Sequence, residues 1–210
     1  MMPKILQVTM LVLITLWGVP SAMAIEEPKF EVIEQDGDYQ VRLYAPKIIA
    51  EVLIDGDLDE ASSKGFRLIA AYIFGENTSA KGEAEKIAMT APVTTAPSPE
   101  KIAMTAPVTM AAAGNQYRMF FVMPSSYTMA TLPKPNNAKV SLREVLTQKA
   151  AVLQFSWLAG EEKVAEKTAL LQQWMKNKGL QATAPAQLAR YNPPWTLPFL
   201  RRNEIIIPIE

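Results

Sequence analysis

The chain has 210 residues, 49% of them hydrophobic, which suffices for a real core in one domain or at most two small ones. Its 21 Lys and Arg residues balance 21 Asp and Glu residues, so the overall charge gives no reason to expect nucleic acid or an anionic membrane as partner. The absence of Cys and His excludes disulfides, thiolate chemistry, Ser-His-Asp triads and metal sites built on those two residue types.

The first 24 residues have the pattern of an export signal. The apolar run from Ile5 to Val19 is too short for a comfortable transmembrane helix, and small side chains then mark a cleavage site after Ala24. We therefore expect a signal peptide over residues 1–24 and a mature domain over residues 25–210, which would be periplasmic or secreted. The alternative is an uncleaved N-terminal membrane anchor.

Strand and helix signals follow in order along the mature chain. Two alternating runs around Asp36-Gly37 predict a β-hairpin, and residues 47–54 predict a third strand. Residues 57–75 predict an amphipathic helix that begins after Asp57, the expected N-cap, and ends at Gly75. The residues expected on its apolar face are Leu58, Ala61, Gly65, Leu68, Ile69 and Tyr72.

One phrase of ten residues, EKIAMTAPVT, occurs twice, at residues 85–94 and 100–109. Its apolar residues recur with a period of two, which predicts a strand with one apolar face in each copy. The segment between the copies, TAPSP, has turn chemistry, so we expect the two copies to pair as antiparallel strands of one hairpin. The residues expected to face the core are Ile87, Met89, Ala91, Val93, Ile102, Met104, Ala106 and Val108.

The second half of the chain has a similar order of elements. Residues 117–124 predict a strand, and two more short strands are expected within residues 139–157. Residues 161–179 predict a helix, because acidic residues begin it, basic residues end it and Gly179 fits the position after it. A last strand is expected near the C-terminus. This order predicts an α+β fold, a twisted and mostly antiparallel barrel or sheet with two flanking helices and two similar halves.

Several motifs in this order resemble the SOUL haem-binding protein family. They are AAYIFGEN at the end of the first helix, KIAMTAPV, FVMP, LPKPN and ARYNPPWTLPFLRRNEI. The resemblance covers the chain from about Phe30 to its C-terminus. It implies a twisted antiparallel barrel with two flanking helices and a pseudo-twofold internal repeat. It also implies reversible binding of haem or a related tetrapyrrole in a shallow apolar groove beside the first helix, for carriage or buffering.

The resemblance also implies which segments contact the ligand. The family's basic helix residues, which meet the haem propionates, align here with Ser63 and Ala71, while Lys64 and Arg67 lie roughly 100° or more around the helix. The candidate binding residues of the helix and of the loop before the last strand are Lys64, Phe66, Arg67, Leu68, Tyr72, Tyr191, Trp195, Arg201 and Arg202.

Without His or Cys, a protein ligand to haem iron has to be Met, Tyr or Lys. Met89 and Met104 fit a core role better, and Tyr72 and Tyr191 fit aromatics at the edge of the core. We therefore expect no strong axial ligand. Binding would come from apolar contact with the macrocycle and from charge on the propionates.

Arg201 and Arg202 are the best candidates for the propionates, since a guanidinium binds a carboxylate through two parallel hydrogen bonds. The structural alternative is that one of them pairs with Glu204 and fixes the entry to the last strand. Two roles also stay open for Trp195, which either stacks on the flat ring of the ligand or caps the core after a Pro-Pro turn.

These features predict a binding protein and not an enzyme. The carboxylates near the first helix are explained by capping, and the sequence contains no Gly-rich phosphate loop. The expected partner is a small tetrapyrrole, with no nucleic acid and no stable membrane insertion after cleavage. The alternatives are a protein that binds another ligand or an envelope component without haem, and an enzyme that acts on small amphipathic ligands in the same groove.

Overall fold

The computed structural model describes residues 25–97 and 116–210. The predicted signal peptide and the second copy of the repeated phrase lie outside the described residues. In chain order the elements are β1 (Phe30–Asp36), β2 (Tyr39–Tyr44), β3 (Lys47–Asp55), α1 (Leu58–Ile73), β4 (Asn77–Thr78), β5 (Val93–Pro97), β6 (Gln116–Val122), β7 (Lys134–Pro135), β8 (Ser141–Val145), β9 (Gln148–Phe155), α2 (Glu161–Asn177), β10 (Gln187–Arg190), the 3-10 turn η1 (Pro198–Leu200) and β11 (Asn203–Pro208).

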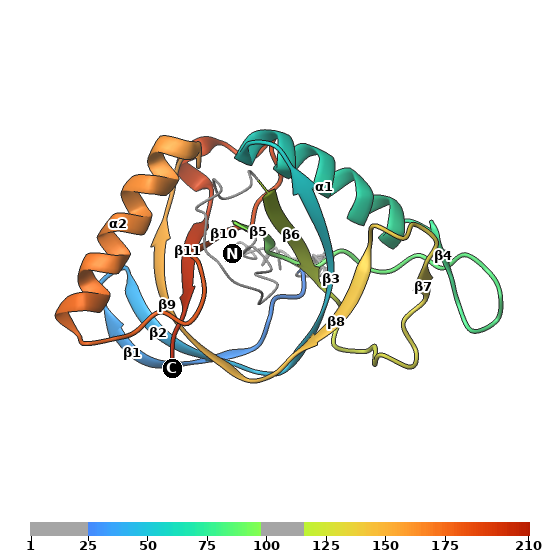
Figure 1. The fold of residues 1–210 in the computed structure, drawn as a ribbon, viewed down its shortest axis with the longest axis horizontal. Coiled ribbons are helices and arrows are strands. Elements are labelled where there is room, and N and C mark those ends of the chain that lie inside the picture. Colours follow the sequence, from blue (N-terminus) through green and yellow to red (C-terminus); the bar gives the residue numbers. More distant parts are fainter. Residues whose placement is uncertain (1–24, 98–115) are drawn as a thin grey trace, which may run out of the picture.

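Nine of the described strands form one antiparallel sheet that curls into a half-barrel (Figure 1). Their order is β1-β2-β9-β11-β10-β5-β6-β3-β8, and β4 and β7 pair separately. This confirms the predicted α+β class, with a twisted antiparallel sheet and two helices, while the internal twofold repeat stays a prediction. Within the described part of the chain, neither helix is long and apolar enough to cross a membrane.

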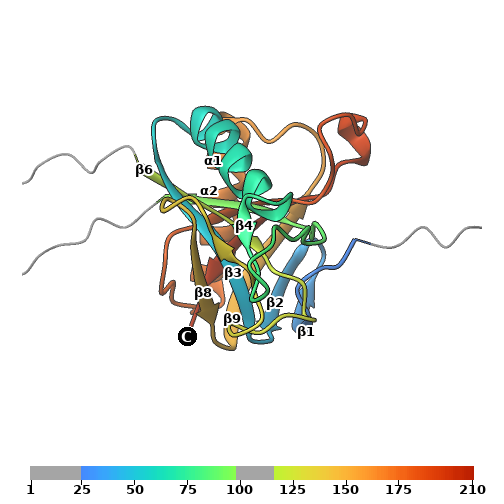
Figure 2. The same cartoon turned by 90° about the vertical axis from the view of Figure 1, so that its right-hand side faces the viewer.

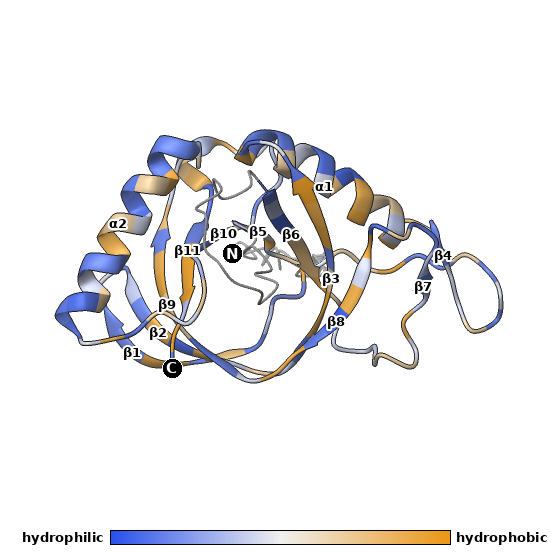
Figure 3. Ribbon diagram, viewed as in Figure 1, coloured by the Kyte–Doolittle hydropathy of each residue, from blue (hydrophilic) through white to orange (hydrophobic). Residues whose placement is uncertain are grey.

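Both helices pack on the same face of the sheet, called the helix face below. Directly paired residues share a face, and the ladder Ile205–Leu188–Thr95–Met119–Val52 runs across five strands. At one end of this ladder the core includes buried residues of α2, and at the other end it includes buried residues of α1. Figure 3 shows the hydrophobic residues of β3 and of α1, whereas α2 is mostly hydrophilic. The sheet face turned away from the helices is called the far face.

The first helix begins where the sequence predicts. Asp57 is its N-cap, and its carboxylate accepts a hydrogen bond from the backbone N–H of Glu60 at 2.7 Å. Gly65 faces β6, where a Cβ would lie 2.9 Å from the sulfur of Met119, so this glycine lets the helix approach the sheet closely. The chain leaves the helix through Gly75, whose φ of +125° favours glycine.

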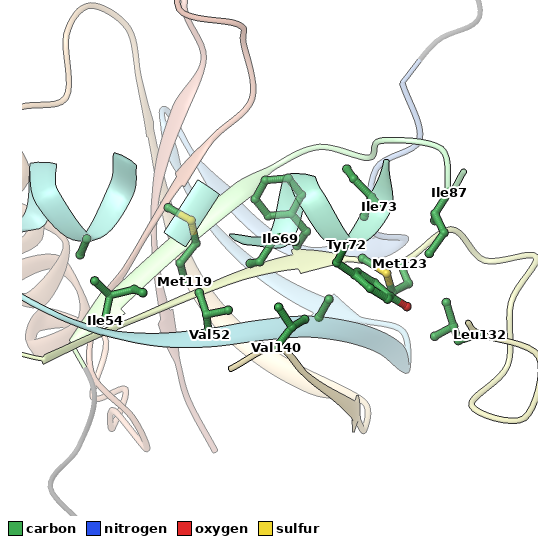
Figure 4. Close-up of a cluster of buried hydrophobic side chains, with 13 residues drawn as sticks. Val52, Ile54, Ile69, Tyr72, Ile73, Ile87, Met119, Met123, Leu132 and Val140 are labelled. Atoms are coloured by element: carbon green, nitrogen blue, oxygen red, sulfur yellow. The ribbon is translucent and has the colours of Figure 1, made fainter. Parts of the chain in front are cut away.

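The predicted apolar face of α1 packs into the core (Figure 4). Tyr72 is 1% exposed, and its hydroxyl donates a hydrogen bond to the carbonyl of Pro133 at 2.9 Å. Burial raises the pKa of Tyr72 to about 12. Leu68 packs against the same cluster and is partly buried. Both side chains therefore hold α1 on the sheet.

The first copy of the repeated phrase is not the continuous strand that its alternation predicts. Residues 84–92 have no regular structure, and β5 begins only at Val93. Ile87 and Ala91 are buried, but Met89 is 37% exposed, so its predicted place in the core is wrong. The alternating pattern therefore predicted burial correctly at some positions, but the strand pairing that it also predicted does not form there.

Backbone hydrogen bonds explain this difference. The N–H of Ile87 donates to the carbonyl of Ile73 at the end of α1, and the N–H of Ala91 donates to the carbonyl of Glu26. These two acceptors belong to different parts of the chain, so the segment crosses the fold and does not join a ladder. The strand that follows, β5, pairs with β6 on one side and with β10 on the other.

Candidate functional site: a groove beside the first helix

A groove of about 830 Å³ lies on the helix face, between α1 and the segments that precede α2 and β11. This volume lies in the usual range of small-molecule sites. Residues of α1 form one wall, β5 and β6 form the floor, and two loops form the other wall. The residues that line the groove include Asp59, Ser62, Phe66, Arg67, Val93, Met119, Leu158, Ala159, Arg190, Pro194 and Arg201.

Exposed apolar side chains form a large part of the groove. Phe66 is 39% exposed, and its ring centroid lies 5.6 Å from that of the fully buried Phe121. This contact with a fixed core residue holds the exposed ring in place. Leu158, on the opposite wall, is 58% exposed. The groove therefore presents preformed apolar surface from both sides.

Three arginines line the same groove, and each has a different environment. Arg67 is exposed, and in the described part of the chain no hydrogen bond or ion pair joins its guanidinium to another residue. Arg190 donates to the Ser62 hydroxyl at 3.0 Å and to the Ala159 carbonyl at 2.9 Å. It therefore ties α1 to the loop before α2, and its burial lowers its pKa.

Arg201 stabilises the loop before β11, which forms the groove wall opposite α1. Its Nε donates to the carbonyl of Thr196 at 2.8 Å, and a second nitrogen donates to the carbonyl of Pro194. The carboxylate among the described lining residues is that of Asp59. With three arginines and one aspartate, the groove carries an excess of positive charge, which favours an anionic ligand.

The groove contains only part of the helix set that the resemblance implied. Phe66 and Arg67 line it. Lys64 does not line the groove. Its side chain is exposed, and its Nζ pairs with Glu60 at 2.5 Å. Leu68 and Tyr72 lie beneath α1 in the core and do not line the groove.

The candidate binding residues of the loop before β11 are divided in the same way. Of these residues, Arg201 lines the groove. The hydroxyl of Tyr191 donates to Glu204 at 2.7 Å, on the far face. Arg202 lies over the Tyr191 ring, and its Nε lies 3.8 Å from Glu204, so the structural pairing considered for one of the two arginines holds for Arg202. Trp195 is 82% exposed, so it does not cap the core, and it does not line the groove.

Sequence reasoning missed Arg190. It stands at the end of the short strand β10, inside the motif ARYNPPWTLPFLRRNEI but just before the loop from which the candidate residues were chosen, and its importance comes from the tertiary fold. Because β10 lies between β11 and β5 in the sheet, the last residue of this strand reaches α1. No local signal in the sequence connects Arg190 with Ser62.

A second cluster of charges lies on the far face of the sheet. Its charged groups are buried and pair with one another. Arg42 and Glu204 are 3% and 1% exposed, and they form two hydrogen bonds of 2.8 and 3.0 Å. Tyr44 accepts from Arg42 at 3.1 Å, and burial raises the pKa of Tyr44 to about 12. Burial also raises the pKa of Tyr191, which shares Glu204. We call this set of four residues the ion cluster.

Solved structures share this fold at low sequence identity. The crystal structure of the EcmrR C-terminal domain matches with a TM-score of 0.59 and 11% identity, over 82% of this chain and 96% of that chain. A hydrolase from Listeria innocua matches with a TM-score of 0.57 and 12% identity, over 85% of this chain and 94% of that chain. Likeness at such identity shows the fold alone.

The family comparison is more specific. No curated protein matches the chain at a significant level. The family model described as SOUL heme-binding protein matches residues 25–208, which is most of the chain. The motifs that carried the resemblance lie within this range. The chain therefore belongs to the SOUL haem-binding protein family.

Proposed function

We propose that this protein binds haem or a related tetrapyrrole reversibly in the groove beside α1, for carriage or buffering. The observation that carries the proposal is the juxtaposition of exposed apolar walls, Phe66 and Leu158, with Arg67, which has no partner among the described residues. A tetrapyrrole has a flat apolar ring with carboxylates at its edge, and so presents the complementary chemistry. Family membership supports the same class of ligand.

Each groove residue has a distinct role in this proposal. Phe66 and Leu158 contact the macrocycle, where an aromatic side chain provides a large apolar surface. Arg67 binds a propionate, because a guanidinium without an internal partner can form both parallel hydrogen bonds. Arg190 ties the two walls together and Arg201 stabilises the loop before β11, because nitrogens of both guanidiniums donate to protein oxygens.

The donor set fits the ring and carboxylates of a tetrapyrrole better than its metal. Among the described residues, no group of three or more His, Cys, Asp or Glu could hold a metal ion. Of the residue types that can bind haem iron here, the described lining offers Met119, which is 1% exposed beneath Gly65. When bound, haem would bring an iron centre, and the chain's own part is to bind and orient the ring.

The proposed role is binding without catalysis, in an exported protein. The described lining of the groove contains one carboxylate, Asp59, and general acid–base chemistry commonly needs a second titratable partner. Export is proposed from the sequence, with residues 1–24 as a signal peptide and an uncleaved anchor as the alternative.

Titration of the purified protein with hemin tests the proposal. A saturable change of the Soret band at micromolar hemin is expected, and iron-free protoporphyrin should compete, because the ring and carboxylates supply most of the contact. Arg67→Gln should weaken binding by about tenfold, the loss of one charge-assisted pair. Lys64→Gln is the matched control, since it removes an exposed cation of the same helix that does not line the groove.

The absence of saturation at micromolar hemin, together with no binding of iron-free protoporphyrin, would contradict tetrapyrrole binding. The groove would then serve another anionic, partly apolar ligand, or an envelope component.

A further inference from the structure

The end of the molecule beside the groove exposes six large apolar side chains from two loops. Figure 2 shows the loop before β11, with η1, projecting from the body of the molecule beside α1. We call the exposed residues of this loop and of the loop before α2 the tip patch. Its members are 55% to 82% exposed, and they are Trp157, Leu158, Trp195, Leu197, Phe199 and Leu200. Exposed apolar surface gathered in this way marks an interaction site.

Hydrogen bonds hold the two loops of the tip patch together. The N–H of Trp157 donates to the carbonyl of Pro198 at 2.9 Å, and the side chain of Asn203 donates to the carbonyl of Trp157 at 2.9 Å. Arg201 donates to the carbonyl of Thr196. Trp157 also has a φ of +80°, which is unfavourable for an aromatic residue and persists only where the surroundings impose it. The apolar side chains are therefore held outward by a fixed backbone.

The composition of the loops indicates what they contact. Residues 155–160 and 191–200 contain no charged side chain, so the patch can enter an apolar phase without stripping water from a charge. Cations lie at its border. Arg201 follows it in the chain, and Lys163 and Lys167, both paired with Glu166, line the same hollow as Trp157 together with Asp38. Tryptophan and other large apolar residues beside basic groups are typical of protein segments at the bilayer interface.

We propose that the tip patch docks this protein on the surface of a lipid bilayer. The shape of the patch favours a bilayer over a protein partner, because its residues project from a loop, whereas protein interfaces place their anchors in complementary pockets with matched hydrogen bonds. The docking is peripheral and involves the side chains of two loops. Leu158 belongs both to the patch and to the groove, so docking places the mouth of the groove at the lipid surface.

Quenching of tryptophan fluorescence by brominated lipids tests the proposal on the full chain. The chain has four tryptophans, and Trp17→Phe with Trp174→Phe leaves the two of the tip patch. The fluorescence then comes from the patch alone. It reports on the patch even if the apolar N-terminal segment enters the vesicles, because that segment no longer carries a tryptophan. Zwitterionic vesicles containing brominated lipid should quench this fluorescence, because apolar contact drives the docking and the bordering lysines already pair with Glu166.

Three further variants in this background, one of them a control, make the test specific. Phe199→Ser and Leu200→Ser should each lower the partitioning of the patch by about tenfold, the value of one buried large apolar side chain. Leu146→Ser, which replaces an apolar residue that is 78% exposed between β8 and β9, should change nothing. All three positions are exposed, so urea unfolding should show the same stability for each variant.

Unquenched patch tryptophans at saturating lipid would overturn the proposal. A second result would also overturn it: sedimentation shows a dimer that Phe199→Ser disperses, and lipid leaves the fluorescence unchanged. The patch would then bind a second copy of the chain.

Discussion

Arginine serves two opposite purposes in this protein. In the ion cluster on the far face, Arg42 is 3% exposed and binds Glu204 through two hydrogen bonds. In the groove on the helix face, Arg67 is exposed and has no partner among the described residues. The guanidinium of Arg42 is bound within the fold, whereas that of Arg67 is available to a ligand. Arginine content alone therefore does not locate an anion site.

The physical difference lies in solvation. A buried ion pair has lost its water and depends on its partner, so removal of one member leaves an uncompensated charge in a medium of low dielectric constant. An exposed guanidinium keeps its water, and its removal changes stability little. The two regions should therefore respond to mutation in opposite ways, with stability affected in the ion cluster and binding affected in the groove.

The largest effect is expected from Glu204→Gln, which leaves Arg42 buried beside a neutral group. Loss of one partner of a buried pair costs about 3–5 kcal/mol of folding free energy. Urea unfolding measures this change. The control is Glu34→Gln, which breaks a surface pair with Lys178 and should cost less than about 1 kcal/mol. Equal losses in the two variants would contradict the distinction between the regions.

Tyr191→Phe should have a smaller effect in the same cluster. It removes a hydrogen bond of 2.7 Å to Glu204, and a bond to a charged group contributes about 2 kcal/mol. Tyr127→Phe is the comparison, since its bond to Glu85 is nearer to solvent and its loss should cost less. Hemin affinity should stay unchanged in Tyr191→Phe, because Tyr191 does not line the groove. A loss of affinity at unchanged stability would move the binding site to the far face.

Lys47 makes stability depend on pH. Its Nζ lies 4.4 Å from the ring centroid of Tyr44, and burial lowers its pKa from 10.5 to about 8. Between these values the unfolded chain holds a proton that the folded chain has lost, so stability should rise with pH, by at most about 1.4 kcal/mol per pH unit. Above pH 10.5 the trend should reverse, because Lys47 no longer contributes there and burial raises the pKa of Tyr44 from 10.0 to about 12. Lys47→Met should remove the rise in a series of urea unfolding curves and keep the fall.

The smallest effect on stability is expected in the groove. Phe66→Ser removes a ring that is 39% exposed and touches Phe121, so the cost should be about 1 kcal/mol or less. Hemin titration should nevertheless show weaker binding. Phe74→Ser is the matched control, because Phe74 is 58% exposed at the end of α1 and does not line the groove. Equal affinities of the two variants would contradict the assignment of Phe66 to the binding wall.

Much of the fold was predictable because its signals are local. Asp57 caps α1 through a hydrogen bond between residues three positions apart, so the sequence pattern contains both partners. Gly37 and Gly179 have φ values of +59° and +71°, in the left-handed region where glycine is preferred, and both mark ends of elements predicted from the sequence. The hairpin, both helices and their order follow from features of this kind.

The repeated phrase shows where such signals fail. Its period of two predicted one strand, yet the backbone N–H of Ile87 binds the end of α1 and β5 begins only at Val93. Met89 is exposed because residues outside the phrase decide which positions are covered. Periodicity records which side chains are apolar, and the tertiary neighbours decide which of them are buried.

The candidate site divides along the same line. Motifs, caps and periodicity are properties of neighbouring residues, and they were enough to predict the family, the α+β class and an amphipathic helix that carries Phe66 and Arg67. Long-range packing was needed to show that Arg67 lines the groove while Arg42 pairs with Glu204, and that Arg190 reaches α1. The physical reason is that burial and pairing depend on contacts between residues far apart in the chain, as with the 162 positions that separate Arg42 from Glu204.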